Sequence, residues 1–160
     1  MSSDAHGGHH SYGFFRKYVW STNHKVIGKQ SMWLGFVWLL VGGTMAMMIR
    51  WQLAYPDSKF PLGFMVPSRV LDEGHITPPV YNQLFTMHGT IMIFFVIIPM
   101  LTGAFGNYLI PLMIGARDMA FPTLNMLSYW VMWPAFGVFI ASFLVQGGAQ
   151  YGPAAGWTAY

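Results

Sequence analysis

A single histidine interrupts a long stretch of the sequence that is otherwise apolar and uncharged. His88 lies in the segment Thr86-Met87-His88-Gly89-Thr90, about two helical turns from one end of that stretch. An ionisable side chain in an apolar span is costly and by default marks a functional site. Neutral imidazole is the usual axial ligand of haem iron, and Gly89 would let a large planar group approach. We therefore treat His88 as a candidate haem ligand. The alternative is a neutral histidine that hydrogen-bonds to a neighbouring helix.

Arg50 lies at the end of a different apolar stretch. The simpler interpretation is that its long side chain reaches to the membrane surface and anchors the end of a helix. The guanidinium could also offer a fixed charge and a fork of donors to a carboxylate or polarised carbonyl on a cofactor.

Asp118 stands in a polar turn beside Arg117, with Asn107 before it and Asn125 after it. An acid followed by polar amides would suit a water-filled path for protons. Capping of the following helix, or an ion pair with Arg117, is the simpler interpretation. The histidines outside the apolar stretches, His24 and His75, are expected to be solvated or interfacial.

The composition excludes an ordinary soluble domain. Charged residues make up 8% of the chain and apolar residues 54%, whereas a soluble domain has roughly 25% charged residues. The absence of cysteine excludes a disulfide framework and thiolate metal sites. The formal charge of +3 is too small and too scattered to favour nucleic acid as a partner.

Three apolar segments are long enough to cross a bilayer, which takes about 20 residues. We therefore predict an all-α membrane protein. The second and third segments contain Pro99 and Pro134, which we interpret as kinks that neighbouring helices can tolerate in a membrane. The predicted helices cover about 31–51, 81–110 and 124–146, joined by an outer loop at 52–80 and an inner loop at 111–123.

Residues 1–29 are predicted to form a polar tail on the cytoplasmic side, rather than a signal peptide. The positive residues Arg16, Lys17, Lys25 and Lys29 place this flank inside. His6, His9 and His10 could bind a metal, but we interpret them as part of a solvated tail.

Four segments resemble subunit I of the haem-copper oxidases, the cytochrome c oxidase family. Residues 21–28 resemble the segment before that subunit's first helix, and residues 88–95 resemble its second helix. The most specific match is the run 103–122, and residues 156–160 resemble a later segment. The similarity covers nearly all of the chain from Ser21 onward.

The resemblance implies a role for each candidate residue. It makes His88 one of two axial ligands of the low-spin haem, and it places Arg50 against the formyl group of haem a. It makes Asp118 the opening of a proton-uptake channel lined by Asn107 and Asn125. The fold implied is part of a twelve-helix bundle, in which residues 30–160 supply the first three helices.

The resemblance also implies what the whole enzyme does. It would be an integral, multi-pass membrane oxidoreductase and translocase that reduces oxygen with electrons from cytochrome c and moves protons. Its partners would be the rest of subunit I, an electron-accepting subunit II, cytochrome c and membrane lipid. We expect a bacterial plasma membrane, with the mitochondrial inner membrane as the alternative. The remaining haem ligand and all copper ligands would lie on later helices, so this segment alone is not expected to reduce oxygen.

The sequence departs from the family pattern at two places, and several alternative functions stay open. Gln52 stands where many family members have a glutamate, so no cation site is predicted there, and the loop around residues 59–73 is longer than in compact members. The chain could instead be a catalytically silent relative or fragment, or part of a quinol-oxidising relative. A cytochrome b-type bundle would need paired histidines on two helices, and a nitric oxide reductase is disfavoured by Asp118, Asn107 and Asn125.

Overall fold

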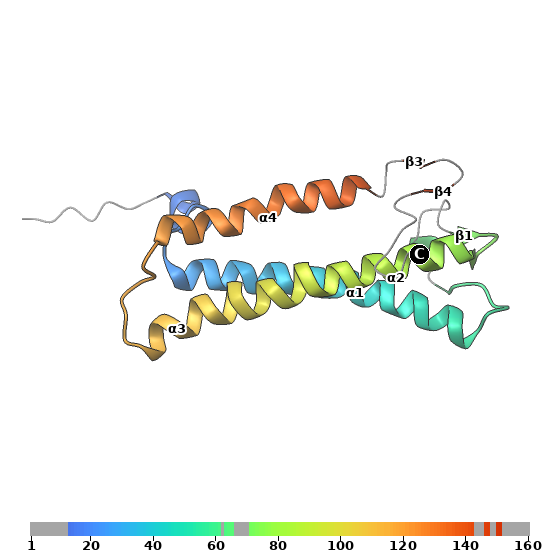
Figure 1. Ribbon diagram of the computed structural model, residues 1–160, viewed down its shortest axis with the longest axis horizontal. Helices are drawn as coiled ribbons and strands as arrows, with labels where there is room; N and C mark the ends of the chain where they lie inside the picture. Colours follow the sequence, from blue (N-terminus) through green and yellow to red (C-terminus); the bar gives the residue numbers. More distant parts are fainter. Residues whose placement is uncertain (1–12, 62, 66–70, 143–145, 148–149, 152–160) are drawn as a thin grey trace, which may run out of the picture.

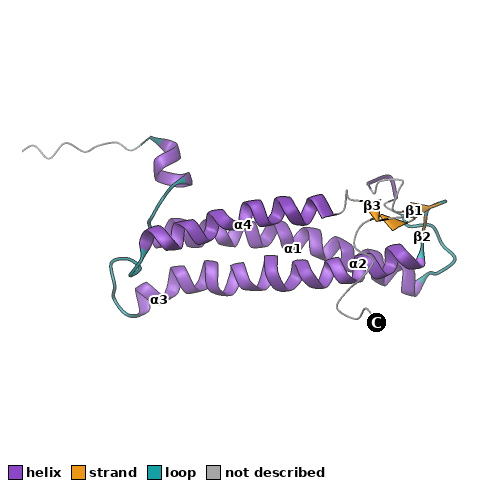
Figure 2. Ribbon diagram, turned by 45° about the horizontal axis from the view of Figure 1, so that its top comes forward, coloured by secondary structure: helices purple, strands orange, loops and turns teal. Residues whose placement is uncertain are grey.

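Three long helices lie side by side in the computed structural model (Figures 1 and 2). The structure describes residues 13–61, 63–65, 71–142, 146–147 and 150–151. Within these residues, three helices are long and apolar enough to cross a membrane: His24–Ala54, Pro78–Met113 and Pro122–Ser142. The prediction of an all-α membrane protein with three spans is therefore confirmed.

The first helix, α1, covers His24–Ala54 and begins within the predicted tail. Asn23 caps it, because the side-chain oxygen of Asn23 accepts a hydrogen bond from the backbone N–H of Lys25 (2.9 Å). Lys25 and Lys29 are exposed on its first turns. The predicted helix began later, at about residue 31, because hydropathy marks only the apolar part of a helix. The polar residues of the first turns are helical as well.

The second span is one continuous helix built from four pieces. These are α2 (Pro78–Thr90), the π-helical segments η3 (Ile91–Ile97) and η4 (Pro99–Gly106), and α3 (Asn107–Met113). The helix runs through Pro99, although proline has no N–H for the backbone ladder. The two π segments lie on either side of Ile98, and Pro99 is the first residue of η4. In a π-helix each N–H bonds to the carbonyl five residues earlier, rather than four.

The third span, α4, covers Pro122–Ser142 and runs through Pro134. Residues 143–145 lie outside the described residues, and Gln146, which was predicted to end this span, lies instead in a short strand. The remaining elements are the π-helical turn η1 (Phe15–Val19), the 3₁₀ turn η2 (Gly63–Met65), and two antiparallel pairs, β1 (Leu71–Asp72) with β2 (His75–Ile76) and β3 (Gln146–Gly147) with β4 (Gln150–Tyr151).

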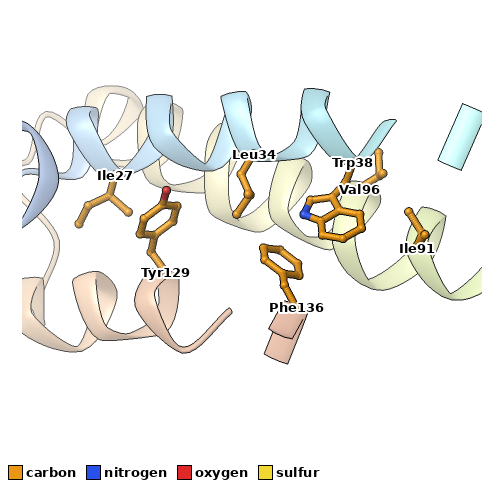
Figure 3. Close-up of a cluster of buried hydrophobic side chains, with 7 residues drawn as sticks. All are labelled: Ile27, Leu34, Trp38, Ile91, Val96, Tyr129 and Phe136. Carbon is orange, nitrogen blue, oxygen red and sulfur yellow. The ribbon is translucent and has the colours of Figure 1, made fainter. Parts of the chain in front are cut away.

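Helix α1 packs against both of the other spans. The main core combines residues of α1, η3 and α4, as Figure 3 shows. Trp38 of α1 lies against Phe136 of α4, with ring centroids 4.7 Å apart. The core residues drawn are Ile27, Leu34, Trp38, Ile91, Val96, Tyr129 and Phe136.

A second, smaller core closes one end of the bundle. Phe60 and Ile76 of the long loop are buried against Met48 of α1 and Leu84 of α2. The turn between β1 and β2 contains Gly74, whose φ of 92° favours glycine. Part of the loop therefore packs on its own chain.

Candidate functional site

His88 is fixed by a hydrogen bond to the neighbouring helix. Its Nδ1 lies 2.9 Å from the carbonyl oxygen of Gly42 in α1. A carbonyl oxygen can only accept, so Nδ1 carries the proton and donates it. The lone pair of the neutral ring is then on Nε2. The two interpretations of His88 are therefore compatible, because hydrogen bonding uses one nitrogen and leaves the other for a metal.

The close approach of two helices makes this bond possible. A Cβ on Gly42 would lie 2.8 Å from the Sδ of Met92 and 3.1 Å from the Cγ2 of Ile91. A larger residue at position 42 would therefore force the side chains of Met92 and Ile91 to shift. Beside the histidine, a Cβ on Gly89 would meet no described atom within 4 Å. The helix surface next to His88 is thus uncrowded, as a large planar ligand requires.

Arg50 lies on α1 toward the same end of the bundle as His88. It is exposed and stands two turns beyond Gly42, roughly 12 Å along the helix at 1.5 Å per residue. Both interpretations of this arginine, as an anchor of the helix end and as a cofactor contact, fit its position.

Asp118 lies at the opposite end of the bundle, against the start of α1. Its Oδ1 accepts hydrogen bonds from the backbone N–H groups of Met119 (2.9 Å) and His24 (3.3 Å). The prediction that it caps the following helix was wrong, because the acceptor reaches the first helix instead. A carboxylate there is also favoured by the positive end of the α1 dipole.

His24 is a site residue that the sequence analysis missed. It was expected to be solvated or interfacial, but it is 1% exposed. Its Nδ1–H donates to the backbone carbonyl of Asn107 (2.8 Å), so its ring lies between α1 and α3. The Nδ2 of Asn107 in turn donates to the carbonyl of Gly103 (2.8 Å). The capping residue Asn23 was the available signal that a helix begins here and carries His24 into the interface.

Asn107 and Asp118 both hydrogen-bond to His24, whereas Asn125 makes no hydrogen bond to these residues in the described part of the chain. Asn125 lies in the first turn of α4, and its Nδ2 is buried with no hydrogen-bond partner among the described residues. A buried amide donor without a partner is uncommon and calls for an explanation. Buried polar groups of this kind are often satisfied by an ordered water.

The candidate residues thus form two groups at opposite ends of the helices. His88 lies in α2 and Arg50 near the end of α1, whereas Asn107 begins α3 and Asp118 follows it. Figure 1 shows α2 and α3 at opposite ends of the second span. His88 and Asn107 are 19 residues apart on one continuous helix, so the two groups lie far apart along the bundle. In the described part of the chain, no cluster of three His, Cys, Asp or Glu side chains could hold a metal ion. The N-terminal histidines lie outside it.

The chain is similar to known proteins over most of its length. Residues 26–160 match the family model described as cytochrome C and quinol oxidase polypeptide I. The chain is 45% identical over 150 residues to cytochrome c oxidase subunit 1 of Thermostichus vulcanus, covering 94% of this chain and 24% of the relative. It is 38% identical over 173 aligned positions to the subunit of the same name from Cereibacter sphaeroides, covering 97% and 30%.

The same similarity extends to a eukaryotic relative. The cytochrome c oxidase subunit 1 of Mytilus edulis is 38% identical over 147 residues, which cover 92% of this chain and 23% of the relative. The chain thus spans about a quarter of the length of these relatives. Haem and copper are the metal groups that this family implies for the complete enzyme. By the match of residues 26–160, the chain belongs to the family of cytochrome c and quinol oxidase polypeptide I, and its three spans are part of that subunit's all-α membrane fold.

Proposed function

We propose that this chain forms the first three helices of the catalytic subunit of a terminal respiratory oxidase. The complete enzyme would reduce oxygen to water with electrons from cytochrome c and couple this reaction to proton translocation. The observation that carries the proposal is His88, whose Nδ1–H is held by the carbonyl of Gly42 within a membrane span. The relatives are named for cytochrome c, but the family description includes quinol oxidases, so quinol is the alternative donor.

His88 would act as one axial ligand of a low-spin haem through its Nε2. The Gly42 carbonyl would fix the tautomer, orient the ring and increase the basicity of the ligating nitrogen. Arg50 would reach a peripheral oxygen of the macrocycle, the formyl group if the haem is haem a, and stabilise partial negative charge there. When bound, the haem would supply reversible one-electron transfer at its iron.

Asp118 would collect protons at the other end of the bundle. Its carboxylate lies in a polar turn and is held by the backbone N–H groups of His24 and Met119. Asn107 and Asn125 would line the inward path. The buried Nδ2 of Asn125 supports this role, because a water in the path would give that donor its missing acceptor.

The remaining parts of the site would come from elsewhere in the enzyme. The second haem ligand and the copper ligands would lie on the rest of subunit I, and electrons would arrive through subunit II. Negative charge added to a haem in a low-dielectric interior is unfavourable unless it is compensated. Proton uptake from the Asp118 end would supply the compensating charge.

The test replaces His88 and Asp118 separately in the assembled enzyme. His88→Ala should abolish the absorption band of the low-spin haem, whereas His75→Ala, a histidine outside the spans, should leave it unchanged. Asp118→Asn should lower turnover and proton release. A His88→Ala enzyme that keeps the low-spin spectrum would exclude the ligand assignment, and unchanged pumping in Asp118→Asn would exclude the proton path. A complex without haem spectra or oxygen consumption would favour a silent relative.

A further inference from the structure

An open groove runs along the bundle at the end where α1 begins. It has a volume of about 450 Å³ and lies between one face of α1, the first half of α4 and the turn η1. Lys29, Trp33 and Val37 line it from α1, Tyr129 and Trp133 line it from α4, and Tyr18 lines it from η1. Its volume lies within the roughly 300–1,000 Å³ of typical small-molecule sites.

The lining changes from charged to apolar along the groove. Lys29, Trp33 and Val37 are spaced by four residues and therefore share one face of α1. Lys29 is exposed near the basic end of the bundle, and Val37 lies roughly 12 Å deeper along the helix axis. The groove thus offers positive charge at its mouth and an apolar surface at depth.

The turn η1 is held in place at the mouth of the groove. The ring of Trp20 stacks on that of Trp130 in α4, with centroids 4.7 Å apart and an angle of 16° between the planes. The side-chain amide of Gln30 donates to the backbone carbonyl of Tyr18 and, more weakly, to that of Val19 (3.4 Å). These contacts join η1 to both α1 and α4, so Tyr18 lies on a wall fixed by the protein's own interactions.

We propose that this groove binds one anionic phospholipid. Its phosphate would lie at Lys29 with the hydroxyl of Tyr18, and an acyl chain would lie along Trp33, Val37 and Trp133. This occupant satisfies both ends of the groove, because it presents negative charge to the lysine and hydrocarbon to the apolar part. A packed apolar helix would instead bury Lys29 without a counter-charge, which is costly. The proposal goes beyond the oxidase function and requires no haem.

The experiment measures lipid binding to the intact oxidase complex that contains this chain. Native mass spectrometry would follow phosphatidylglycerol and, separately, zwitterionic phosphatidylcholine. Lys29→Gln should weaken phosphatidylglycerol binding by about fivefold, the usual effect of one basic residue near an anionic membrane surface. Phosphatidylcholine binding should not change. The matched control is Lys25→Gln, which removes an exposed lysine of the same helix that does not line the groove.

A second variant tests the apolar part of the groove. Val37→Trp would fill it, and should reduce retention of both lipids without removing a charge. Unchanged phosphatidylglycerol binding in both Lys29→Gln and Val37→Trp would overturn the proposal. A photo-reactive residue introduced at Trp33 should cross-link to lipid. Cross-linking to another polypeptide of the complex would show that protein covers the groove and would also overturn it.

Discussion

His88 and His24 make the same kind of interhelical hydrogen bond at opposite ends of the bundle. Each donates its Nδ1–H to a backbone carbonyl of another helix, His88 to Gly42 and His24 to Asn107. In the first bond the donor is in the second span and the acceptor is in α1. In the other bond the donor is in α1 and the acceptor is in the second span. Each bond fixes the orientation of its ring and uses Nδ1, which leaves Nε2 as the other ring nitrogen. The helix contacts around Gly42 and Asn107 therefore matter for function as well as for packing.

A substitution at Gly42 should disturb the proposed haem ligand without touching it. In Gly42→Val, the new side chain meets the side chains of Met92 and Ile91, and we expect the resulting repacking to lengthen the hydrogen bond to His88. Loss of such a supporting contact typically costs 10–100-fold in metal affinity. We expect the assembled oxidase to lose haem or to show a shifted low-spin band in its absorption spectrum.

The control for this experiment is the next residue. Gly43→Val changes helix propensity by the same amount, but its Cβ meets no described atom within 4 Å. It should keep the wild-type spectrum. Equal spectra for the two variants would mean that the Gly42 contact does not position His88.

His24 should matter for stability through its buried donor. His24→Leu removes the N–H that the carbonyl of Asn107 accepts from and puts an apolar side chain beside this polar group. The free energy of unfolding should fall by about 1–3 kcal/mol. His24→Asn places an amide donor near the position of Nδ1 and should recover part of this loss. Thermal unfolding in detergent would measure both. A His24→Leu protein as stable as the wild type would contradict the role assigned to this bond.

The sequence alone identified His88 as a candidate site residue but did not predict the burial of His24, and the difference has a physical reason. His88 was recognisable because it stands in an uncharged apolar span, where an ionisable group is costly. His24 lies between Asn23 and Lys25, which look like part of a polar tail. Its burial arises from contact with a helix about 80 residues away in the sequence, and local composition cannot predict such a contact.

At the scale of the helix, three glycines form a seam along α1. Gly28, Gly35 and Gly42 are seven residues apart, a spacing that keeps them near one face. A Cβ on Gly28 would lie 3.2 Å from atoms of Ala104 and Tyr108, and one on Gly35 would lie 2.5 Å from Met100. Small residues at this spacing let membrane helices approach closely. The spacing is visible in the sequence, but hydropathy, from which the spans are predicted, does not single out a repeat of small residues.

Filling the seam should destabilise the helix pair. Gly35→Leu places a side chain where Met100 already lies, and such overpacking typically costs 1–3 kcal/mol. Gly137→Leu on α4 is the matched control, because a Cβ there meets no described atom within 4 Å. The thermal midpoint of the chain in detergent micelles should fall for the first variant only. A fall of equal size in both would show that the seam has no special role in packing.

Some features of the helices could not be predicted from local sequence. The pattern gave three spans and their approximate centres, because span length and hydropathy are local properties. The change from α to π geometry around Pro99 depends on how the freed backbone groups are satisfied by the surrounding turns. Gln146 likewise lies in a short strand and pairs with Tyr151 rather than ending the predicted third span, and hydropathy does not encode such a pairing.

At the scale of the whole molecule, the proposed chemistry depends on which end faces which side of the membrane. Electrons from cytochrome c would reach the His88 end from outside, and protons would reach Asp118 from inside. The basic flank that includes Lys25 and Lys29 lies at the Asp118 end, which the positive-inside rule places in the cytoplasm. A single orientation therefore fits both the charge distribution and the proposed paths.

This orientation can be measured with single cysteines, because the chain contains none of its own. Asp57→Cys places an exposed thiol in the loop near the His88 end, and Ala120→Cys places one in the turn beside Asp118. In bacterial spheroplasts, a membrane-impermeant maleimide should label Asp57→Cys directly and Ala120→Cys only after permeabilisation, since the inner turn is shielded by the bilayer. The reverse pattern would put Asp118 on the side of the electron donor, and proton uptake from the cytoplasm through this residue would then be impossible. Labelling of both cysteines before permeabilisation would mean that the chain does not insert in one orientation. In that case the basic flank does not set the orientation, and replacing Lys25 and Lys29 with glutamine should leave the labelling of both cysteines unchanged.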